Sequence, residues 1–208
     1  MSSFAQRAII TFTLGPIALI VIYLGGLFYA IPLAFVLAVA AVEFAQLGRN
    51  LGWKTSAWIL VPAVLPFFFA GWWRHWNLLA PVTLVALLVV MVYALWLYEI
   101  KKDDTAPATW MAMTGGIILL GWVGSHFFSL RSMNSMAWQW TMLAMLSTWI
   151  ADSGAYLTGK FLAGNIIGKH YLSPRLSPNK TVEGYIGGIF FGTAFTIALA
   201  YFLDLPLI

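Results

Sequence analysis

The chain consists mainly of long, almost uninterrupted apolar runs that are separated by short polar segments. These runs lie near residues 8–24, 27–47, 56–73, 79–98, 109–129, 136–157 and 184–203. Each is close to the length of about 20 residues that an α-helix needs to cross the hydrocarbon core of a bilayer. The pattern therefore predicts an all-α, polytopic membrane helix bundle with about seven transmembrane helices.

Composition supports the same class of protein. Of the 208 residues, 62% are hydrophobic and only 9% are charged, whereas soluble domains average about 25% charged residues. This leaves no room for a sizeable soluble domain, so we expect residues 1–208 to form a single membrane domain. We interpret the first run as a retained helix, because a second run follows at once without a clear cleavage pattern.

The positions of lysine and arginine predict the orientation. With seven spans, all but Arg74 and Arg131 of the 11 basic residues fall on one side of the membrane. Short loops that are translocated avoid positive charge. We therefore expect the N-terminus in the cytoplasm, the C-terminus outside, and a multi-pass protein of the cell membrane whose active face is cytoplasmic.

The segment after residue 150 differs from the rest of the chain. Asp152 lies in an apolar, small-residue helix, where a carboxylate is costly unless a cation compensates it. Residues 158–181 follow as the longest non-apolar stretch, and we expect them to form a cytoplasmic substrate loop. Its cationic side chains resemble an anion receptor, although the alternative of positive residues facing anionic lipid stays open. These side chains are Lys160, Lys169, His170, Arg175 and Lys180.

The start of the last helix adds to this picture. Ser177-Pro178 and Thr181 both offer helix starts, which places Lys180 near a helix N-terminus. A cation there opposes the helix dipole unless an anion binds between them, and phosphate is the obvious candidate. Glu183 has three alternatives: pairing with Lys180, capping free amide groups, or holding a divalent cation together with Asp152.

These residues carry a resemblance to a known family, the CDP-diacylglycerol synthases, also called phosphatidate cytidylyltransferases. The matching positions are Trp149, Asp152 to Tyr156, Gly159-Lys160, Gly168 to His170, Leu172, Ser177-Pro178, Lys180-Thr181, Glu183-Gly184 and Gly187-Gly188. The resemblance implies that CTP and phosphatidate are converted to CDP-diacylglycerol and pyrophosphate in phospholipid synthesis, with Mg²⁺ as cofactor. It also implies membrane lipid as a partner and a homodimer as a candidate assembly. We expect no nucleic-acid partner.

Carried over residue by residue, the resemblance implies three sets of site residues. Asp152 and Lys180 are candidates for catalysis, and Asp152 and Glu183 for binding the metal. The candidates for substrate binding are Lys169, His170, Ser177, Pro178, Lys180, Thr181 and Glu183.

One departure from the family pattern leaves two hypotheses. The family continues past this last helix and carries a further signature, in which a Lys-Asp pair is followed by a His-Gly-Gly and an Asp-Arg-x-Asp run, and these 208 residues do not contain that signature. The chain is then either a cytidylyltransferase of phospholipid synthesis or a truncated, non-catalytic relative that binds nucleotide or lipid phosphate. Transport ranks below both hypotheses, because no carboxylate is placed convincingly at mid-membrane.

Overall fold

The computed structural model describes residues 3–73, 75–165 and 168–206. The chain divides into two compact units, Met1–Ala137 and Trp138–Ile208, which we call unit 1 and unit 2. Helices cover every apolar run that the sequence predicts as a span. The prediction of an all-helical membrane protein is confirmed at this coarser level.

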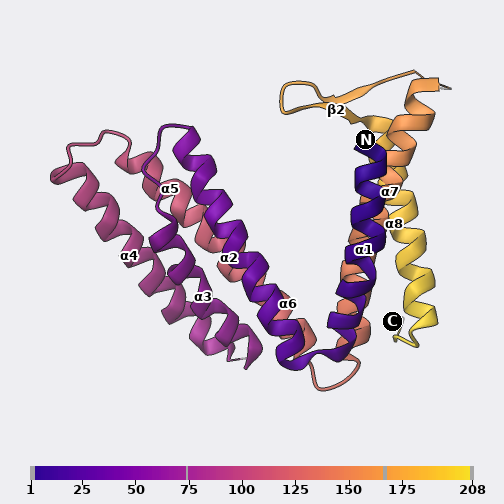
Figure 1. Cartoon of the computed structure of the whole chain (residues 1–208), viewed down its shortest axis with the longest axis horizontal. Helices are drawn as coiled ribbons and strands as arrows, with labels where there is room; N and C mark the ends of the chain where they lie inside the picture. Colours follow the sequence, from indigo (N-terminus) through magenta and orange to yellow (C-terminus); the bar gives the residue numbers. More distant parts are fainter. Residues whose placement is uncertain (1–2, 74, 166–167, 207–208) are drawn as a thin grey trace. The chain divides into compact units, whose positions relative to one another are not determined.

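Unit 1 contains four helices followed by one long, composite helix (Figure 1). The composite helix changes from α-helical to π-helical geometry and back between residues 106 and 131. The elements are α1 (Ser3–Leu24), α2 (Gly26–Asn50), α3 (Ala57–Trp72), a 3₁₀ turn (Trp76–Leu78), α4 (Leu79–Glu99), α5 (Ala106–Gly116), the π-helical segment η2 (Ile117–Val123) and α6 (Gly124–Arg131).

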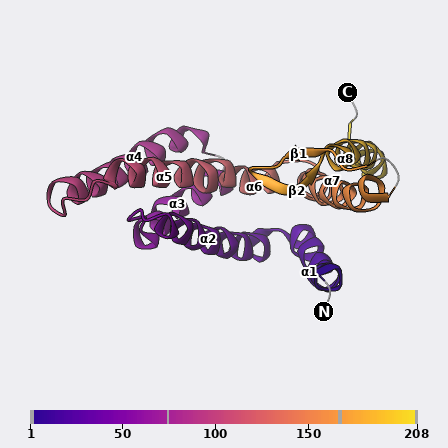
Figure 2. The same ribbon diagram turned by 90° about the horizontal axis from the view of Figure 1, so that it is seen from above.

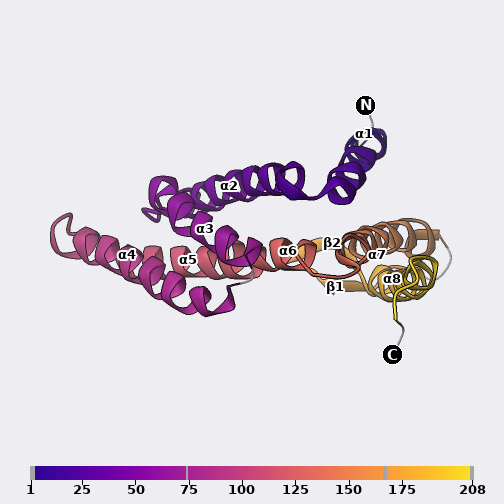
Figure 3. The ribbon, with the colours of Figure 1, turned by 90° about the horizontal axis from the view of Figure 1, so that it is seen from below.

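Helix α3 forms the centre of unit 1, where it packs against α2, α4, the π-helical segment η2 and α6 (Figures 2 and 3). Its side chains Leu60, Val64 and Phe67 are completely buried. A Cβ on Gly121 of the π-helical segment would lie 2.8 Å from the ring of Phe67. The wide π turn therefore packs directly on α3 because glycine leaves room for the aromatic ring.

The first helix is attached to α6 through one arginine. The Arg131 Nε donates a hydrogen bond to the Ile22 carbonyl at 2.7 Å, and its Nη2 donates to the Tyr23 carbonyl at 3.0 Å. These carbonyls belong to the last turn of α1, where a helix leaves acceptors without intrahelical partners. Gly25 follows with φ of 62°, and a Cβ there would clash with the arginine side chain.

Unit 2 consists of two helices joined by a two-stranded antiparallel hairpin (Figure 1). The elements are α7 (Ala137–Asn165), β1 (Tyr171–Ser173), β2 (Ser177–Thr181) and α8 (Val182–Phe202). Helix α7 continues past residue 157, where the sequence analysis ends the sixth span, and reaches into the segment expected to be loop. The hairpin is also new, because the sequence predicted only a turn-rich loop there.

Four helices of the described chain are long and apolar enough to cross a membrane. They are Gly26–Asn50, Leu79–Glu99, Ala106–Arg131 and Val182–Phe202, and shorter apolar helices span Phe12–Leu24 and Ala57–Trp72. These findings support several membrane crossings. The count of seven and the orientation stay predictions.

Replacing Arg131 with methionine should destabilise unit 1, because two carbonyls at the end of α1 lose a charged donor. We expect a loss of about 2 kcal/mol, the usual scale for hydrogen bonds that involve a charged group. Denaturant titration of the purified protein in detergent measures it. Arg175→Met, at an exposed hairpin position, is the matched control, and equal stability of the two variants would contradict the proposed attachment.

Candidate functional site

The two helices of unit 2 pack closely through small residues. A Cβ on Gly187 would lie 2.2 Å from Thr158 Oγ1, and one on Gly184 would lie 2.8 Å from the Ala155 carbonyl oxygen. Such distances leave no space for a larger side chain. The glycines at the start of α8 therefore serve helix packing, which fixes the start of α8 beside the last turns of α7.

Thr181 is the residue at which α8 begins. Its Oγ1 accepts a hydrogen bond from the Gly184 amide at 3.1 Å, which is the geometry of an N-cap, and the residue is buried. Of the two helix starts that the sequence offered, the structure has Thr181. Ser177 and Pro178 instead lie in β2, so proline does not occupy the first turn of the helix.

The register of the hairpin determines which predicted site residues meet. Tyr171 pairs with Thr181, and Ser173 pairs with Ser177. Beyond the first pair, the Val182 amide donates to the His170 carbonyl at 2.8 Å. The end of the hairpin that leads into α8 therefore brings Lys169 and His170, before β1, close to Lys180 at the end of β2. The turn lies at the opposite end of the hairpin. The residues around this entry are Lys169, His170, Lys180, Thr181 and Glu183, while Ser177 and Pro178 lie nearer the turn.

Glu183 and His170 form a side-chain hydrogen bond that the sequence analysis did not anticipate. Glu183 Oε1 lies 2.5 Å from His170 Nδ1. The glutamate side chain is 11% exposed and the imidazole is 69% exposed, and Glu183 Oε2 is buried with no hydrogen-bond partner among the described residues. The glutamate thus contacts the Nδ1 edge of the imidazole and leaves Nε2 directed away from the contact. Antiparallel pairing, had it been recognised, would have indicated this contact.

The exposed lysines complete the cluster. Lys169 and Lys180 are both exposed, and the structure gives neither of them an ion pair with a described residue. Two ammonium groups and an imidazole near the first turn of a helix provide hydrogen-bond donors and positive charge for an anion. Phosphoryl groups are the ligands that such an arrangement suits best.

Asp152 lies apart from this cluster. Its neighbour Ala151 packs against both Gly188 and Gly192, which lie five and nine residues beyond Glu183, so the backbones of Asp152 and Glu183 are offset by about 10 Å along the helix axes. Asp152 is exposed and makes no ion pair with a described residue. The compensating cation expected beside it is not found within residues 168–206 or the other described ranges.

The arrangement does not support a metal bound by both carboxylates. Mg²⁺ holds its oxygen ligands at about 2.1 Å, and a shared ion would require both side chains to extend toward each other over about two helical turns. Glu183 also uses one oxygen for His170. Among the described residues, no group of three histidine, cysteine or acidic side chains is placed to hold a metal ion.

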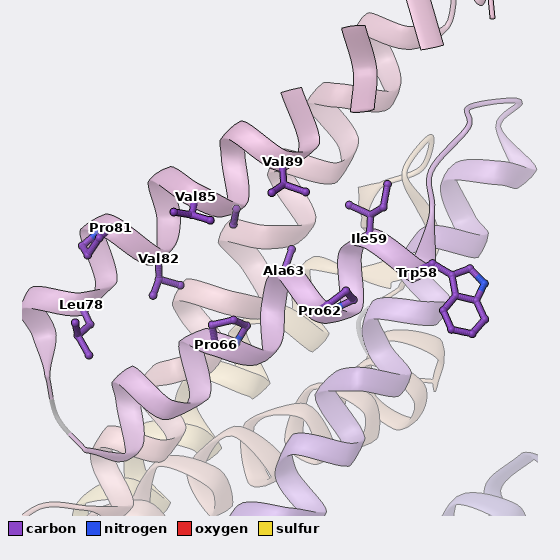
Figure 4. A pocket seen from close by; sticks show the side chains of 11 residues that line it. Trp58, Ile59, Pro62, Ala63, Pro66, Leu78, Pro81, Val82, Val85 and Val89 are labelled. Atoms are coloured by element: carbon purple, nitrogen blue, oxygen red, sulfur yellow. The ribbon is translucent and has the colours of Figure 1, made fainter. Parts of the chain in front are cut away.

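An apolar cavity of about 510 Å³ lies between α3 and α4 in unit 1 (Figure 4). Three prolines line it, Pro62, Pro66 and Pro81, together with aliphatic side chains and Trp58. No charged side chain lines it, so it offers nothing to a phosphoryl group. The cluster at the hairpin is the better candidate for chemistry.

Comparison with known proteins identifies one family profile and several similar proteins that share one name. A profile described as the cytidylyltransferase family matches residues 5–208. The chain is 39% identical over 88 residues to a phosphatidate cytidylyltransferase of Staphylococcus aureus, covering 42% of this chain and 32% of that protein. It is 28% identical over 152 residues to one of Staphylococcus haemolyticus, covering 73% and 53%. A relative in Staphylococcus saprophyticus with the same name is 34% identical over 88 residues, covering 42% and 32%.

The matched part of the chain thus spans between about a third and a half of the length of these curated relatives. No solved structure matches the chain.

Replacing Thr181 with valine should loosen the first turn of α8, because the Gly184 amide loses its acceptor. Loss of an N-cap typically costs about 1 kcal/mol. Hydrogen–deuterium exchange of peptides that cover the start of α8 should be faster in Thr181→Val and unchanged in Thr181→Ser. Protection that is the same in all three proteins would show that the cap does not hold this turn.

Proposed function

This chain belongs to the cytidylyltransferase family, and from this premise we propose that it makes CDP-diacylglycerol and pyrophosphate from CTP and phosphatidate. Its relatives in Staphylococcus aureus and Staphylococcus haemolyticus are named phosphatidate cytidylyltransferases. A membrane protein suits this reaction, because one substrate and one product are lipids while the nucleotide is soluble. The phosphates of both substrates must then meet at a membrane surface.

The observation that carries the proposal is the cationic cluster where the hairpin enters α8. Lys169, His170 and Lys180 surround the N-terminus of a helix that is apolar enough to cross the membrane. A site at this position reaches lipid phosphates at the interface and nucleotide phosphates in water. Positive charge there favours binding of the triphosphate and offsets the charge that builds up during phosphoryl transfer.

The proposed chemistry is a displacement at phosphorus. A phosphate oxygen of phosphatidate attacks the α-phosphorus of CTP, a new P–O bond forms, and the bond from that phosphorus to the bridging oxygen breaks. Pyrophosphate leaves with the electron pair of that bond. Because such a transfer depends mainly on positioning and charge neutralisation, Lys180 and Lys169 are proposed to hold phosphates, and Ser177 and Thr181 to contribute hydroxyl groups.

Glu183 is proposed to fix the orientation of His170, so that Nε2 of the imidazole faces a bound phosphoryl group. The short contact between Glu183 Oε1 and His170 Nδ1 supports this role. Thr181 has a second task, since its hydroxyl already caps the helix. Its contact with substrate would therefore use the remaining lone pair or proton of the same oxygen.

We propose that Mg²⁺ is required, and that it would neutralise the phosphates of CTP when bound. In proteins this ion commonly uses one or two carboxylates and completes its shell with substrate phosphates and water. Asp152 and Glu183 are the candidate ligands in this chain. Their separation along α7 and α8 does not support a single ion shared between them, so no step is assigned to the metal.

We further propose seven spans, a cytoplasmic N-terminus and a cytoplasmic site in the cell membrane. The distribution of lysine and arginine supports this orientation, and CTP is a cytoplasmic metabolite. The expected homodimer and the expected lack of a nucleic-acid partner stay predictions.

Incubating the purified protein with labelled CTP, Mg²⁺ and phosphatidate in mixed micelles tests the activity. Appearance of CDP-diacylglycerol that depends on all three additions supports the proposal. A well-folded protein that binds CTP and forms no product would instead favour the non-catalytic alternative.

Lys180→Ala should weaken CTP binding by about 10- to 100-fold, because losing a charged hydrogen bond to phosphate costs about 1.5–3 kcal/mol. Equilibrium binding of labelled CTP to the protein in detergent measures this change. Lys54→Ala removes the same charge in unit 1 and should leave CTP binding unchanged. Equal, small effects of the two substitutions would argue against the site.

The proposed orientation can be tested by thiol labelling, because the chain contains no cysteine. Single variants Arg175→Cys and Asp204→Cys place a thiol at exposed positions on either side of α8. In intact cells, a membrane-impermeant maleimide should label Asp204→Cys but label Arg175→Cys only after permeabilisation. The reverse pattern would place the hairpin outside the cell and exclude access to cytoplasmic CTP.

A further inference from the structure

A second hollow surrounded by positive charge lies in unit 1, at the turns that connect α2 to α3 and α4 to α5. Its volume is about 710 Å³. Lysines and aromatic rings contribute to its lining, and we call it the basic–aromatic hollow. The residues that matter are Lys54, Tyr93, Trp96, Lys101, Lys102 and Asp103.

Hydrogen bonds on two walls of the hollow fix its backbone. The Tyr93 hydroxyl donates to the Lys54 carbonyl at 2.7 Å, and the Lys54 amide donates to Thr109 Oγ1 at 3.0 Å. The backbone of Lys54 is therefore attached both to α4 and to α5. On the other wall, the Thr105 amide and hydroxyl both donate to Asp103 Oδ1, which orders the turn between α4 and α5.

Lysines outnumber carboxylates on the lining of this hollow. Lys54, Lys101 and Lys102 line it together with Asp103 and Asp104, which leaves one positive charge in excess. Within the described residues, no close ion pair joins these lysines to a carboxylate. Hydrogen bonds from Thr105 hold the pKa of Asp103 below its usual value, and the charge of Lys54 contributes less to this shift. A bound anion would therefore meet a lining with a net positive charge.

Two further features indicate a ligand with both a charged and an apolar part. Lys101 Nζ lies 5.0 Å from the centre of the Trp96 ring, which in turn stacks on Tyr93. Lys101 and Lys102 lie just beyond the end of α4, a helix that suits a membrane span, and Lys54 lies in the connection between α2 and α3. The rings of Tyr93 and Trp96 lie within the last two turns of α4. Charge at the membrane surface with aromatic side chains just below it matches the layout of a phospholipid.

Lys102 has φ of 54°, a left-handed conformation that non-glycine residues rarely adopt. Such backbone strain persists where the surrounding structure enforces it, and it is concentrated at binding sites. Lys102, which adopts this conformation, is one of the residues that line the hollow.

From these observations we propose that the basic–aromatic hollow, which is formed by residues of unit 1 alone, binds the phosphate of an anionic phospholipid. The lysines bind the phosphate, and Trp96 and Tyr93 contact the glycerol and the first methylene groups. The site does not depend on which reaction unit 2 performs. A soluble phosphate compound shares the same chemistry, so the test distinguishes the two sources.

The experiment counts bound lipids by native mass spectrometry. Delipidated protein in detergent is titrated with short-chain phosphatidylglycerol, with short-chain phosphatidylcholine, or with CTP. The test variant is Lys101→Gln/Lys102→Gln, and the charge-matched control is Lys169→Gln/Lys180→Gln. Lys54→Gln provides a second test variant, and a thermal melt confirms that each protein is folded.

We expect the unmodified protein to retain phosphatidylglycerol severalfold more than phosphatidylcholine. The Lys101→Gln/Lys102→Gln variant and Lys54→Gln should lose this preference and keep CTP binding, while Lys169→Gln/Lys180→Gln should show the opposite loss. Unchanged lipid retention in both hollow variants, or equal retention of the two lipids by the unmodified protein, would overturn the inference.

The remaining outcomes are equally informative. If the hollow variants lose CTP and retain the lipid, the hollow binds phosphate from the nucleotide and the lipid assignment is wrong. If Lys169→Gln/Lys180→Gln binds CTP normally while the hollow variants lose the lipid, the proposed function fails and this inference stands.

Discussion

Backbone amides and carbonyls inside a bilayer have no water to bond to, and this constraint organises the whole chain. Every apolar run satisfies its own polar groups by becoming helical, and the polar side chains are left at the helix ends. Apart from Asp152 within α7, the charged residues of the proposed site therefore lie in the hairpin and in the first turn of α8. The proposed position of the site at the membrane surface agrees with this constraint.

Much of the helical fold could be predicted from sequence because it depends on run length and hydrophobicity alone. The runs near 27–47 and 79–98 correspond to α2 and α4 almost residue for residue. The end of α7 could not be predicted in the same way. The composition around Lys160 is typical of a loop. Adding one or two turns to a helix that has already formed costs little free energy, however, because only the first turn of a helix is costly to form.

The candidate site was predictable as a set of residues and not as an arrangement. Glu183 had three possible partners in the sequence, and the observed one, His170, was not among them. The contact arises from the pairing of Tyr171 with Thr181 in the hairpin. The two short strands show little alternation of apolar and polar residues, so the sequence did not predict them. Similarly, Asp152 and Glu183 look like a metal pair in sequence, but the packing of Ala151 on Gly192 separates them. Such spacing is set by helix contacts that only the structure reveals.

The attachment of α1 to α6 has a consequence for how the protein is assembled in the membrane. The Ile22 carbonyl accepts its hydrogen bond from Arg131, which is 109 residues later in the chain. During synthesis, the last turn of α1 therefore lacks these two hydrogen bonds until residue 131 has been made. The contact between α1 and α6 can form only after most of unit 1 has been synthesised.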